Sequence, residues 1–242
     1  MIKFFRTIRQ RLLSENKFSK YLIYAIGEIV LVVIGILIAL QINNWNENKK
    51  TEAEEIKILS NLRADLENTL IEYEAAVEFN TLTIAEIGKL QDCKKNNLSY
   101  SEKLDFSFGV FPHFYFSSAI NSTYKSLQTI GIGIIQNDSL KNKIVNVYDV
   151  ILTGFVDYNN NENRLKSTIV DPFFSKHLRY LENSVYSAKP NNYIDLINNK
   201  EFINILSLIK RQRTRGLEKY ENNSLIIEDL IDSINKELKI RN

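Results

Sequence analysis

The sequence predicts an all-α protein with an N-terminal amphipathic helix, one transmembrane helix and a helical bundle with long antiparallel helices. Three observations predict this. One apolar run, Tyr21–Ile42, is far longer than any other in the chain. Apolar residues then recur at steps of three and four over long stretches, which is the period of a helix face. The 242 residues include only 8 Gly and 3 Pro, too few for the many turns of a β-sandwich.

Residues 1–20 are basic and amphipathic. Apolar side chains recur at helical spacing in Ile2, Phe5, Ile8 and Leu12. The basic residues of the stretch are Lys3, Arg6, Arg9, Arg11, Lys17 and Lys20. The pattern predicts a short helix in the plane of a membrane interface, with its apolar face in the lipid. Because Lys and Arg collect on the cytoplasmic side of a span, we expect a cytoplasmic N-terminus and an extracytoplasmic domain after the span.

Residues 21–45 are predicted to form a transmembrane signal-anchor helix. At about 1.5 Å per residue, a run of about 20 apolar residues covers the roughly 30 Å hydrocarbon layer of a bilayer. The run is longer than the roughly 7–15 apolar residues of a cleaved signal peptide, and no A-x-A site follows it at Ala39–Asn43. Trp45 is placed to anchor the helix in the interface on the far side.

Glu28 breaks the apolar run. A carboxylate at the bilayer centre costs about 2.5–3.5 kcal/mol on insertion scales. Steps of three and four place Glu28 on one helix face with small residues. The members of this face are Ala25, Glu28, Val32, Gly35, Ala39 and Ile42. Gly35 and Ala39 form a small-xxx-small pair, which lets two helix backbones approach closely, so the face predicts helix–helix association with Glu28 inside it.

A second interpretation of this face stays open. Gly and Ala are also common in membrane helices that have no helical partner. In that case Glu28 reaches the cytoplasmic headgroups, or pairs with Lys17 or Lys20.

Two long helices are predicted in the domain over residues 46–242. The first, Thr51–Gln91, has an apolar stripe that Asn80 interrupts, and no Gly or Pro separates it from the span. Its stripe is Leu59, Leu62, Leu66, Leu70, Tyr73, Val77, Ile84 and Ile87. The second is Glu201–Leu238. Its stripe is Phe202, Ile205, Ile209, Gly216, Tyr220, Ile227, Leu230, Ile234 and Leu238. Such stripes are typical of a bundle core.

Asn96–Phe116 has a different composition. It contains seven aromatic residues without a helical period, together with Gly109 and Pro112. These aromatic residues are Tyr100, Phe106, Phe108, Phe111, Phe114, Tyr115 and Phe116. We expect an irregular segment that packs over the bundle, because aromatic side chains usually supply core area. The alternative is an exposed apolar patch for a partner.

A shorter helix is expected next, capped by Ser117 or Ser118 and ending at Gly131. Its inward residues are Ile120, Tyr124 and Leu127. The Gly-x-Gly of Gly131–Gln136 lacks the third glycine of a dinucleotide-binding loop, so it predicts a turn between helices.

Asp138 is predicted to cap the following helix. The inward residues expected from its period are Leu140, Ile144, Val147, Ile151, Phe155, Leu165 and Ile169. Asp171-Pro172 starts another short helix that reaches about Leu181, with the proline in the first helical position. Residues 183–199 have the composition of a loop.

Four cations lie together in the middle of the last helix: Lys210, Arg211, Arg213 and Arg215. One interpretation is a contact with an anionic lipid headgroup or an acidic partner. The other is a solvated helix face, or ion pairs with acids of the first long helix. Those acids are Glu67, Glu72 and Glu74.

We find no motif of an enzyme or a metal site. His113 and His177 are the only histidines, Cys93 is the only cysteine, and the chain has no H-E-x-x-H, C-x-x-C or P-loop. We therefore expect no catalytic activity, no metal and no cofactor. The net charge of +2 also argues against binding to nucleic acid through bulk charge.

The first 48 residues, above all Met1–Arg6, Ser14–Lys17 and Tyr24–Glu47, resemble a family of uncharacterised membrane proteins of Bacteroidota-type Gram-negative bacteria. A weaker resemblance covers Tyr124–Asp138. The resemblance implies an inner-membrane location with the large domain in the periplasm. It implies no activity.

The leading hypothesis is a non-enzymatic, membrane-anchored assembly, scaffold or sensing subunit. It would self-associate through the Glu28 face and present its bundle to a periplasmic partner. The alternative is a single-span subunit of a proton-coupled complex, in which Glu28 titrates and a multi-span partner completes the proton path. A ligand sensor would additionally require a pocket in the bundle.

Overall fold

The computed structural model describes residues 18–117, 119–182 and 184–241. The predicted interfacial helix over residues 1–20 therefore lies almost wholly outside the described residues. The chain divides into two compact units, Met1–Glu55 and Ile56–Asn242, which we describe separately.

Helix α2 (Phe18–Lys95) is continuous through both predicted segments, the span and the first long helix. This confirms the expectation that no break separates them, and the reason is local, since no Gly or Pro lies between Ile42 and Thr51. Its last turn carries Lys94 and Lys95, where cations favour the negative end of the helix dipole.

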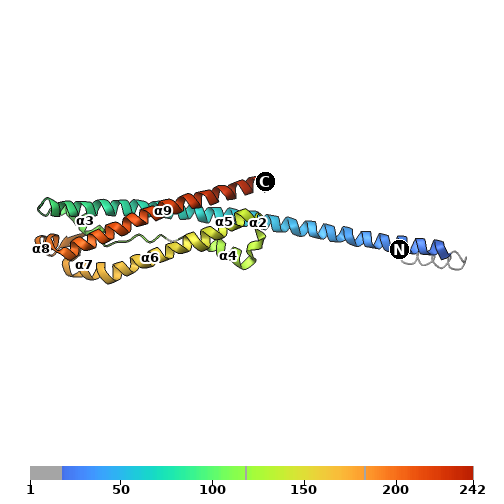
Figure 1. The fold of residues 1–242 in the computed structure, drawn as a ribbon, viewed down its shortest axis with the longest axis horizontal. Helices are drawn as coiled ribbons and strands as arrows, with labels where there is room; N and C mark the ends of the chain where they lie inside the picture. Colours follow the sequence, from blue (N-terminus) through green and yellow to red (C-terminus); the bar gives the residue numbers. More distant parts are fainter. Residues whose placement is uncertain (1–17, 118, 183, 242) are drawn as a thin grey trace. The chain divides into compact units, whose positions relative to one another are not determined.

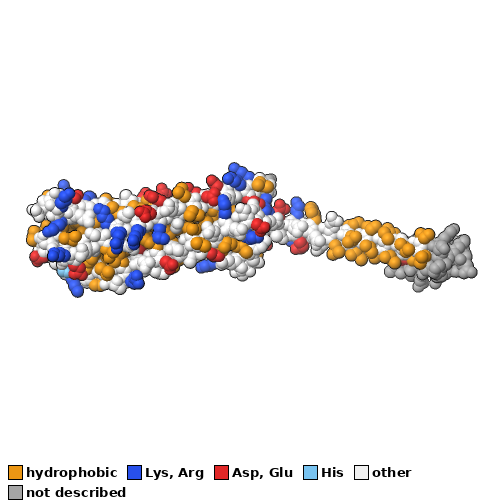
Figure 2. Space-filling model, viewed as in Figure 1, with side chains coloured by type: hydrophobic (Ala, Val, Ile, Leu, Met, Phe, Trp, Pro, Cys, Tyr) orange, Lys and Arg blue, Asp and Glu red, His pale blue; other side chains and the backbone are white. Residues whose placement is uncertain are grey.

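The part of α2 in the first unit is apolar and exposed. The helix contains a segment long and apolar enough to cross a membrane, and none of that segment is buried among the described residues. Figure 2 shows the continuous apolar surface of this segment. Ile23, Ile29 and Leu31 each expose more than 60% of their surface. Large exposed apolar surfaces of this kind mark an interaction site for protein or lipid.

The second unit is built on three long helical rods (Figure 1). The first is the remainder of α2 and the last is α9 (Lys200–Arg241). The middle rod runs without a break through five elements. These are α5 (Asp138–Val145), the π-helical η3 (Asn146–Leu152), α6 (Thr153–Leu165), the π-helical η4 (Lys166–Val170) and α7 (Asp171–His177). The prediction of an all-α bundle with long helices is confirmed.

Two apolar clusters hold the rods together. The first joins the three rods through residues such as Leu62, Phe155 and Ile227. The second includes Phe111 and Phe202. Every residue of the stripe predicted for the last helix is buried, including Gly216. The apolar period of that stretch therefore predicts its inward face correctly.

The two π-helical segments change which residues of the middle rod face inward. Ile151 and Ile169 are not buried as predicted, and Leu152 and Val170 are buried in their place. A π turn contains one more residue than an α turn, so it advances the inward face by one position. The prediction fails here because it assumed an unbroken α-helical period.

The aromatic segment is more regular than predicted. It contains the short 3-10 helix η1 (Glu102–Leu104) and α3 (Asp105–Val110). Phe108 and Phe111 are completely buried in the second cluster, which confirms packing over the bundle for these two rings.

The segment after the middle rod is a β-hairpin, and the helix expected to reach Leu181 ends earlier. Strands β1 (Leu178–Leu181) and β2 (Ser184–Pro190) pair antiparallel, and α8 (Tyr193–Asn198) follows. The helix α3 lies so close to β2 that a Cβ on Gly109 would be 2.3 Å from the Tyr186 carbonyl. Only glycine allows this approach, so tertiary packing stabilises a strand where the sequence predicted a loop.

Two predicted caps are displaced. Asn137, not Asp138, caps α5, because its side chain accepts a hydrogen bond from the Leu140 amide at 3.1 Å. Helix α4 (Ser122–Ile130) begins later than Ser117, and the Thr123 amide donates to Asp65 of α2 at 3.0 Å. A carboxylate from another helix therefore satisfies the N-terminus of α4.

The turn after α4 agrees with the prediction. Gly131 has φ +113°, a conformation that suits glycine, and the 3-10 helix η2 (Ile132–Ile134) leads to α5.

Candidate functional site

The described structure contains three candidate sites: the Glu28 face of α2, a buried ion pair in the bundle, and a polar cleft beside α4. On α2, Ala25, Glu28 and Val32 line one shallow groove. Gly35 has no described atom within 4 Å of the position that a Cβ would occupy. A second helix can therefore approach Gly35 without meeting another part of the described chain.

Trp45 is exposed at the end of the apolar segment. The ammonium group of Lys49 lies 5.5 Å from the centre of the indole ring, within the range of a cation–π contact. An amphipathic ring and a cation at this point fit the interfacial position predicted for Trp45.

The four predicted cations of α9 do not form one surface. Arg213 is 1% exposed and points into the bundle. Lys210 donates a hydrogen bond to Gln91 of α2, and Arg215 donates to Gln212 of its own helix. The prediction of a single four-cation contact is therefore wrong for Arg213, because its place in the helix period faces it inward.

Arg213 forms a buried ion pair with Glu162 of α6, whose side chain is 2% exposed. The guanidinium also donates to the His113 carbonyl at 3.1 Å and lies 4.1 Å from the centre of the Phe114 ring. The second carboxylate oxygen of Glu162 accepts from Gln212 at 3.3 Å. The pair thus links α6, α9 and the segment after α3.

The electrostatics of the pair follow from its burial. Removal from water raises the pKa of the Glu162 carboxyl, and contact with the Arg213 guanidinium opposes that rise. Burial also raises the pKa of Tyr158, whose hydroxyl donates to the Gln212 carbonyl at 3.3 Å. Neither Glu162 nor Arg213 lines the cleft beside α4 that is described below.

The sequence itself contains a signal for this pair. Arg213 lies four residues after Ile209 and three before Gly216, which is a position of the buried stripe. Glu162 lies four residues after Tyr158 and three before Leu165. Two charged residues of opposite sign in apolar stripes indicate a buried pair.

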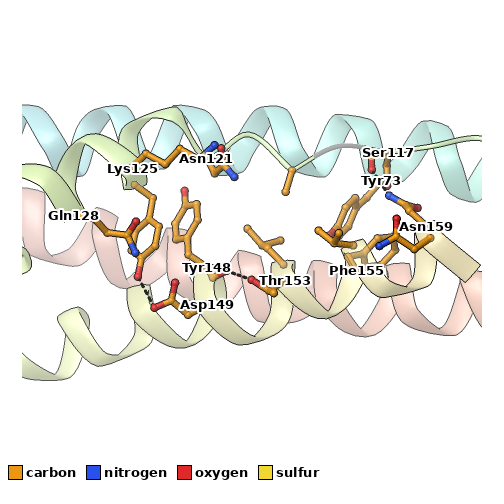
Figure 3. A pocket seen from close by; sticks show the side chains of 15 residues that line it. Tyr73, Ser117, Asn121, Lys125, Gln128, Tyr148, Asp149, Thr153, Phe155 and Asn159 are labelled. Atoms are coloured by element: carbon orange, nitrogen blue, oxygen red, sulfur yellow. Dashed lines mark hydrogen bonds between the residues drawn. The ribbon is translucent and has the colours of Figure 1, made fainter.

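A cleft of about 340 Å³ lies beside α4, between the linker residues Ser117, Ala119 and Asn121 and the middle rod (Figure 3). At one end, Tyr124 stacks on Tyr148 with 4.4 Å between ring centres, and the Tyr124 hydroxyl donates to Asp149 at 2.9 Å. At the other end, Asn159 donates to the Ser117 carbonyl at 3.0 Å. Side chains from α2, α4, η3 and α6 contribute to the walls.

Two buried polar atoms of this cleft lack a hydrogen-bond partner among the described residues. They are the hydroxyl oxygen of Tyr148 and the amide oxygen of Asn159. Burial raises the pKa of the Tyr73 phenol to about 12, and a side-chain hydrogen bond with Asn223 opposes that rise. Burial likewise raises the pKa of Tyr148, with the negative charge of Asp65 adding to the effect. Both phenols are neutral at physiological pH and remain able to donate.

The histidines and the cysteine have structural contacts. The His113 ring lies 2.7 Å from the Val185 carbonyl and 3.1 Å from the Tyr180 hydroxyl, and burial lowers its pKa. His177 stacks on Phe173, and Cys93 is buried. Within the described parts of the chain, no group of three or more His, Cys, Asp or Glu side chains could hold a metal ion.

These features define a helical protein with one candidate membrane helix and a bundle that contains a polar cleft. The chain belongs to a family of unknown function (DUF6090), whose model matches residues 28–213. The match confirms the expectation of an uncharacterised family, and it extends through the bundle, much further than the resemblance of the first 48 residues suggested. Comparisons with curated proteins and with solved structures find no match.

Proposed function

We propose that this protein is a single-pass membrane protein that acts as a non-enzymatic assembly, scaffold or sensing subunit. It self-associates through one face of α2, formed by Ala25, Glu28, Val32, Gly35 and Ala39. Its N-terminus lies in the cytoplasm, and its bundle meets a partner on the periplasmic side of a bacterial inner membrane.

The observation that carries this proposal is the exposure of the apolar segment of α2, none of which is buried among the described residues. Water in contact with so much apolar surface is unfavourable by about 25 cal/mol per Å². A bilayer removes this cost along the whole segment, whereas a soluble partner would have to enclose it on all sides. The exposed Trp45 at its end supports an interfacial position there.

Self-association is supported by the chemistry of the Glu28 face. Lipid chains are as apolar as Leu side chains, so membrane helices associate mainly through close packing and polar contacts. Gly35 and Ala39 permit close packing, and Glu28 supplies the polar group. A second copy of this helix offers the same features in return, so it is the natural partner for this face.

The test is native mass spectrometry of the full-length protein released from mild detergent. We expect a defined homo-oligomer that Gly35→Leu dissociates, because the larger side chain separates the two backbones. Gly27→Leu is the matched control, since Gly27 lies in the same helix, has no described atom within 4 Å of its Cβ position and faces away from the proposed interface. A monomeric wild-type protein, or equal effects of the two variants, would contradict the proposal.

The position of Glu28 within the exposed apolar segment favours one alternative, a single-span subunit of a proton-coupled complex. In that case Glu28 takes up and releases a proton while a multi-span partner completes the path. Glu28→Gln separates the two functions, because glutamine keeps hydrogen bonding but does not titrate. Assembly that survives this change, together with loss of proton flux in vesicles, would favour the alternative. A multi-span protein that co-purifies in the same mass spectra would also favour it.

A further inference from the structure

We propose that the cleft beside α4 is a binding site for a small, neutral, hydroxyl-rich ligand of about the size of a monosaccharide or disaccharide. The site lies wholly in the second unit and is independent of the proposed assembly through α2.

The cleft has the size of a ligand site. Its volume of about 340 Å³ falls within the roughly 300–1,000 Å³ that is usual for small-molecule pockets. Its walls combine aromatic and aliphatic side chains with a few convergent polar groups, the usual composition of such pockets. Figure 3 shows Tyr148 extending from the middle rod across the cleft towards the linker that carries Asn121.

The unpartnered polar atoms indicate that something else completes the cleft. A buried polar group without a hydrogen bond costs about 1–3 kcal/mol, so native proteins rarely leave one. Tyr148 is 4% exposed, yet its hydroxyl has no partner within the described residues. The amide oxygen of Asn159 also has no partner there. Two such atoms around one cavity are a stronger indication of a ligand than a single one would be.

The charges of the cleft favour a neutral ligand. Its buried polar groups are phenols, an amide and the Ser117 hydroxyl, all of them uncharged. Lys125 and Asp149 line its exposed end, and their opposite charges balance. An anion would meet Asp149, and a cation would meet Lys125, with no buried counter-charge to favour either.

The hydrogen-bonding pattern favours hydroxyl groups. Asn159 presents a free acceptor, so the ligand must donate there. The two phenols can donate or accept, and a hydroxyl group can do both. Phe155 and Leu152 supply apolar surface beside these polar atoms. A polyol or sugar, with hydroxyl groups around a C–H framework, satisfies both kinds of surface.

The backbone beside the cleft supports a functional site. Tyr148, Asp149 and Leu152 belong to the π-helical η3, which advances the inward face of the middle rod by one position. Without that shift, the apolar period would place Ile151 inward instead of Leu152. π-helical turns are less stable than α turns and occur frequently at functional sites.

The test is isothermal titration calorimetry with the full-length protein in lipid nanodiscs, free of sugar-headed detergents that would occupy the cleft. The neutral probes are D-glucose, maltose and myo-inositol, and the ionic probes are the zwitterion glycine and the anion inorganic phosphate. We expect saturable binding of at least one neutral probe and none of the ionic probes.

Two variants locate the binding in this cleft. Tyr148→Phe removes one hydroxyl and should weaken binding about tenfold, as expected for one lost hydrogen bond. It should leave Tm unchanged or higher, because that hydroxyl has no partner among the described residues. Val156→Trp places a large ring at the mouth of the cleft, where Val156 is 55% exposed, and should abolish binding with little effect on Tm.

A remote tyrosine provides the matched control. The Tyr193 hydroxyl donates to the Leu98 carbonyl at 2.8 Å, away from the residues that line the cleft. Tyr193→Phe should therefore lower Tm and leave binding unchanged.

Three results would overturn the proposal. The first is the absence of binding by every neutral probe. The second is preferential binding of glycine or phosphate. The third is a lower Tm for Tyr148→Phe without any change in binding, which would mean that internal water satisfies the hydroxyl. Native mass spectra of the same samples report assembly separately, so this proposal and the one for α2 can fail independently.

Discussion

Two of the polar interruptions in the apolar core of the bundle differ in how far side chains of the same chain complete them. At the first, Glu162 and Arg213 form an ion pair, Gln212 donates to Glu162 and the His113 carbonyl accepts from Arg213, while Nε of Arg213 has no partner among the described residues. At the second, the hydroxyl of Tyr148 and the amide oxygen of Asn159 remain without partners among the described residues. The second interruption borders a cleft of about 340 Å³, which neither Glu162 nor Arg213 lines.

The comparison teaches that burial of a polar side chain does not by itself indicate function. A polar group whose partners come from its own chain contributes to a unique packing of the helices. A polar group that faces a cavity without a partner is instead open to a ligand. Mutation of the ion pair should therefore mainly change stability, and mutation of the cleft should mainly change ligand binding.

The largest effect is expected at the ion pair. Glu162→Leu leaves the Arg213 guanidinium buried without its counter-charge, which should lower the free energy of unfolding by about 3–5 kcal/mol. Urea denaturation followed by circular dichroism measures this change.

The matched control replaces both partners. Glu162→Leu with Arg213→Met removes both charges and should recover most of the loss, since buried pairs are often replaceable by apolar residues of similar size. A double variant that is no more stable than Glu162→Leu would show that the pair does not act as a unit.

The next largest effect is expected at Gly216, beside the ion pair. A Cβ there would lie 2.4 Å from the Tyr158 hydroxyl, so Gly216→Ala should destabilise the protein by about 1–3 kcal/mol through overpacking. Gly88→Ala is the control, because Gly88 is also helical and has no described atom within 4 Å of its Cβ position. That change should stabilise the protein by up to about 1 kcal/mol, through helix propensity. Thermal unfolding measures whether each variant raises or lowers Tm. A change of Tm in the same direction for both variants would refute the packing argument.

A smaller effect separates a satisfied phenol from an unsatisfied one. Tyr220 accepts a hydrogen bond from Ser117 at 3.0 Å, so Tyr220→Phe should cost about 1 kcal/mol. Tyr148→Phe should cost nothing in the absence of ligand. Both rings belong to the same apolar cluster, which makes their environments comparable. Equal losses of unfolding free energy for the two variants would remove the distinction on which the cleft proposal depends.

The smallest effect concerns how stability depends on pH, at Glu237 near the C-terminal end of α9. Asn137 donates to Glu237 at 2.7 Å, and Arg241 donates to it at 2.8 Å, and these contacts lower the pKa of the Glu237 carboxyl. A lowered pKa in the folded state stabilises the protein above the ordinary value of 4.5, and this contribution is lost as the pH falls through the folded-state pKa. As the pH is lowered from about 6 to about 3, the free energy of unfolding should therefore fall less steeply for Glu237→Gln than for the wild-type protein. The exposed Glu218→Gln is the control and should keep the wild-type slope.

The parts of the fold that could be predicted from the sequence are those that depend on residues close together in the chain. The continuity of α2 and the buried stripe of α9 depend on residues three or four apart and on the absence of Gly and Pro, which are properties of the sequence itself. The apolar segment of α2 and the Glu28 face have the same origin. The predicted position of Trp45 also follows from its place at the end of that segment.

The tertiary structure decided everything that requires contact between distant residues. Glu162 and Arg213 are 51 residues apart, and Asp65 satisfies the start of α4 from 58 residues away. The β-hairpin depends on the close approach of Gly109 to Tyr186, and the cleft is assembled from four separate elements.

The two π-helical segments show the physical reason for this division. The sequence determined which residues are apolar and therefore which helices form. The register in which those helices bury their faces is set by the competition between hydrogen-bond geometry within the rod and packing against the other two rods. That competition buries Leu152 and Val170 instead of Ile151 and Ile169, and it brings Tyr148 to the cleft.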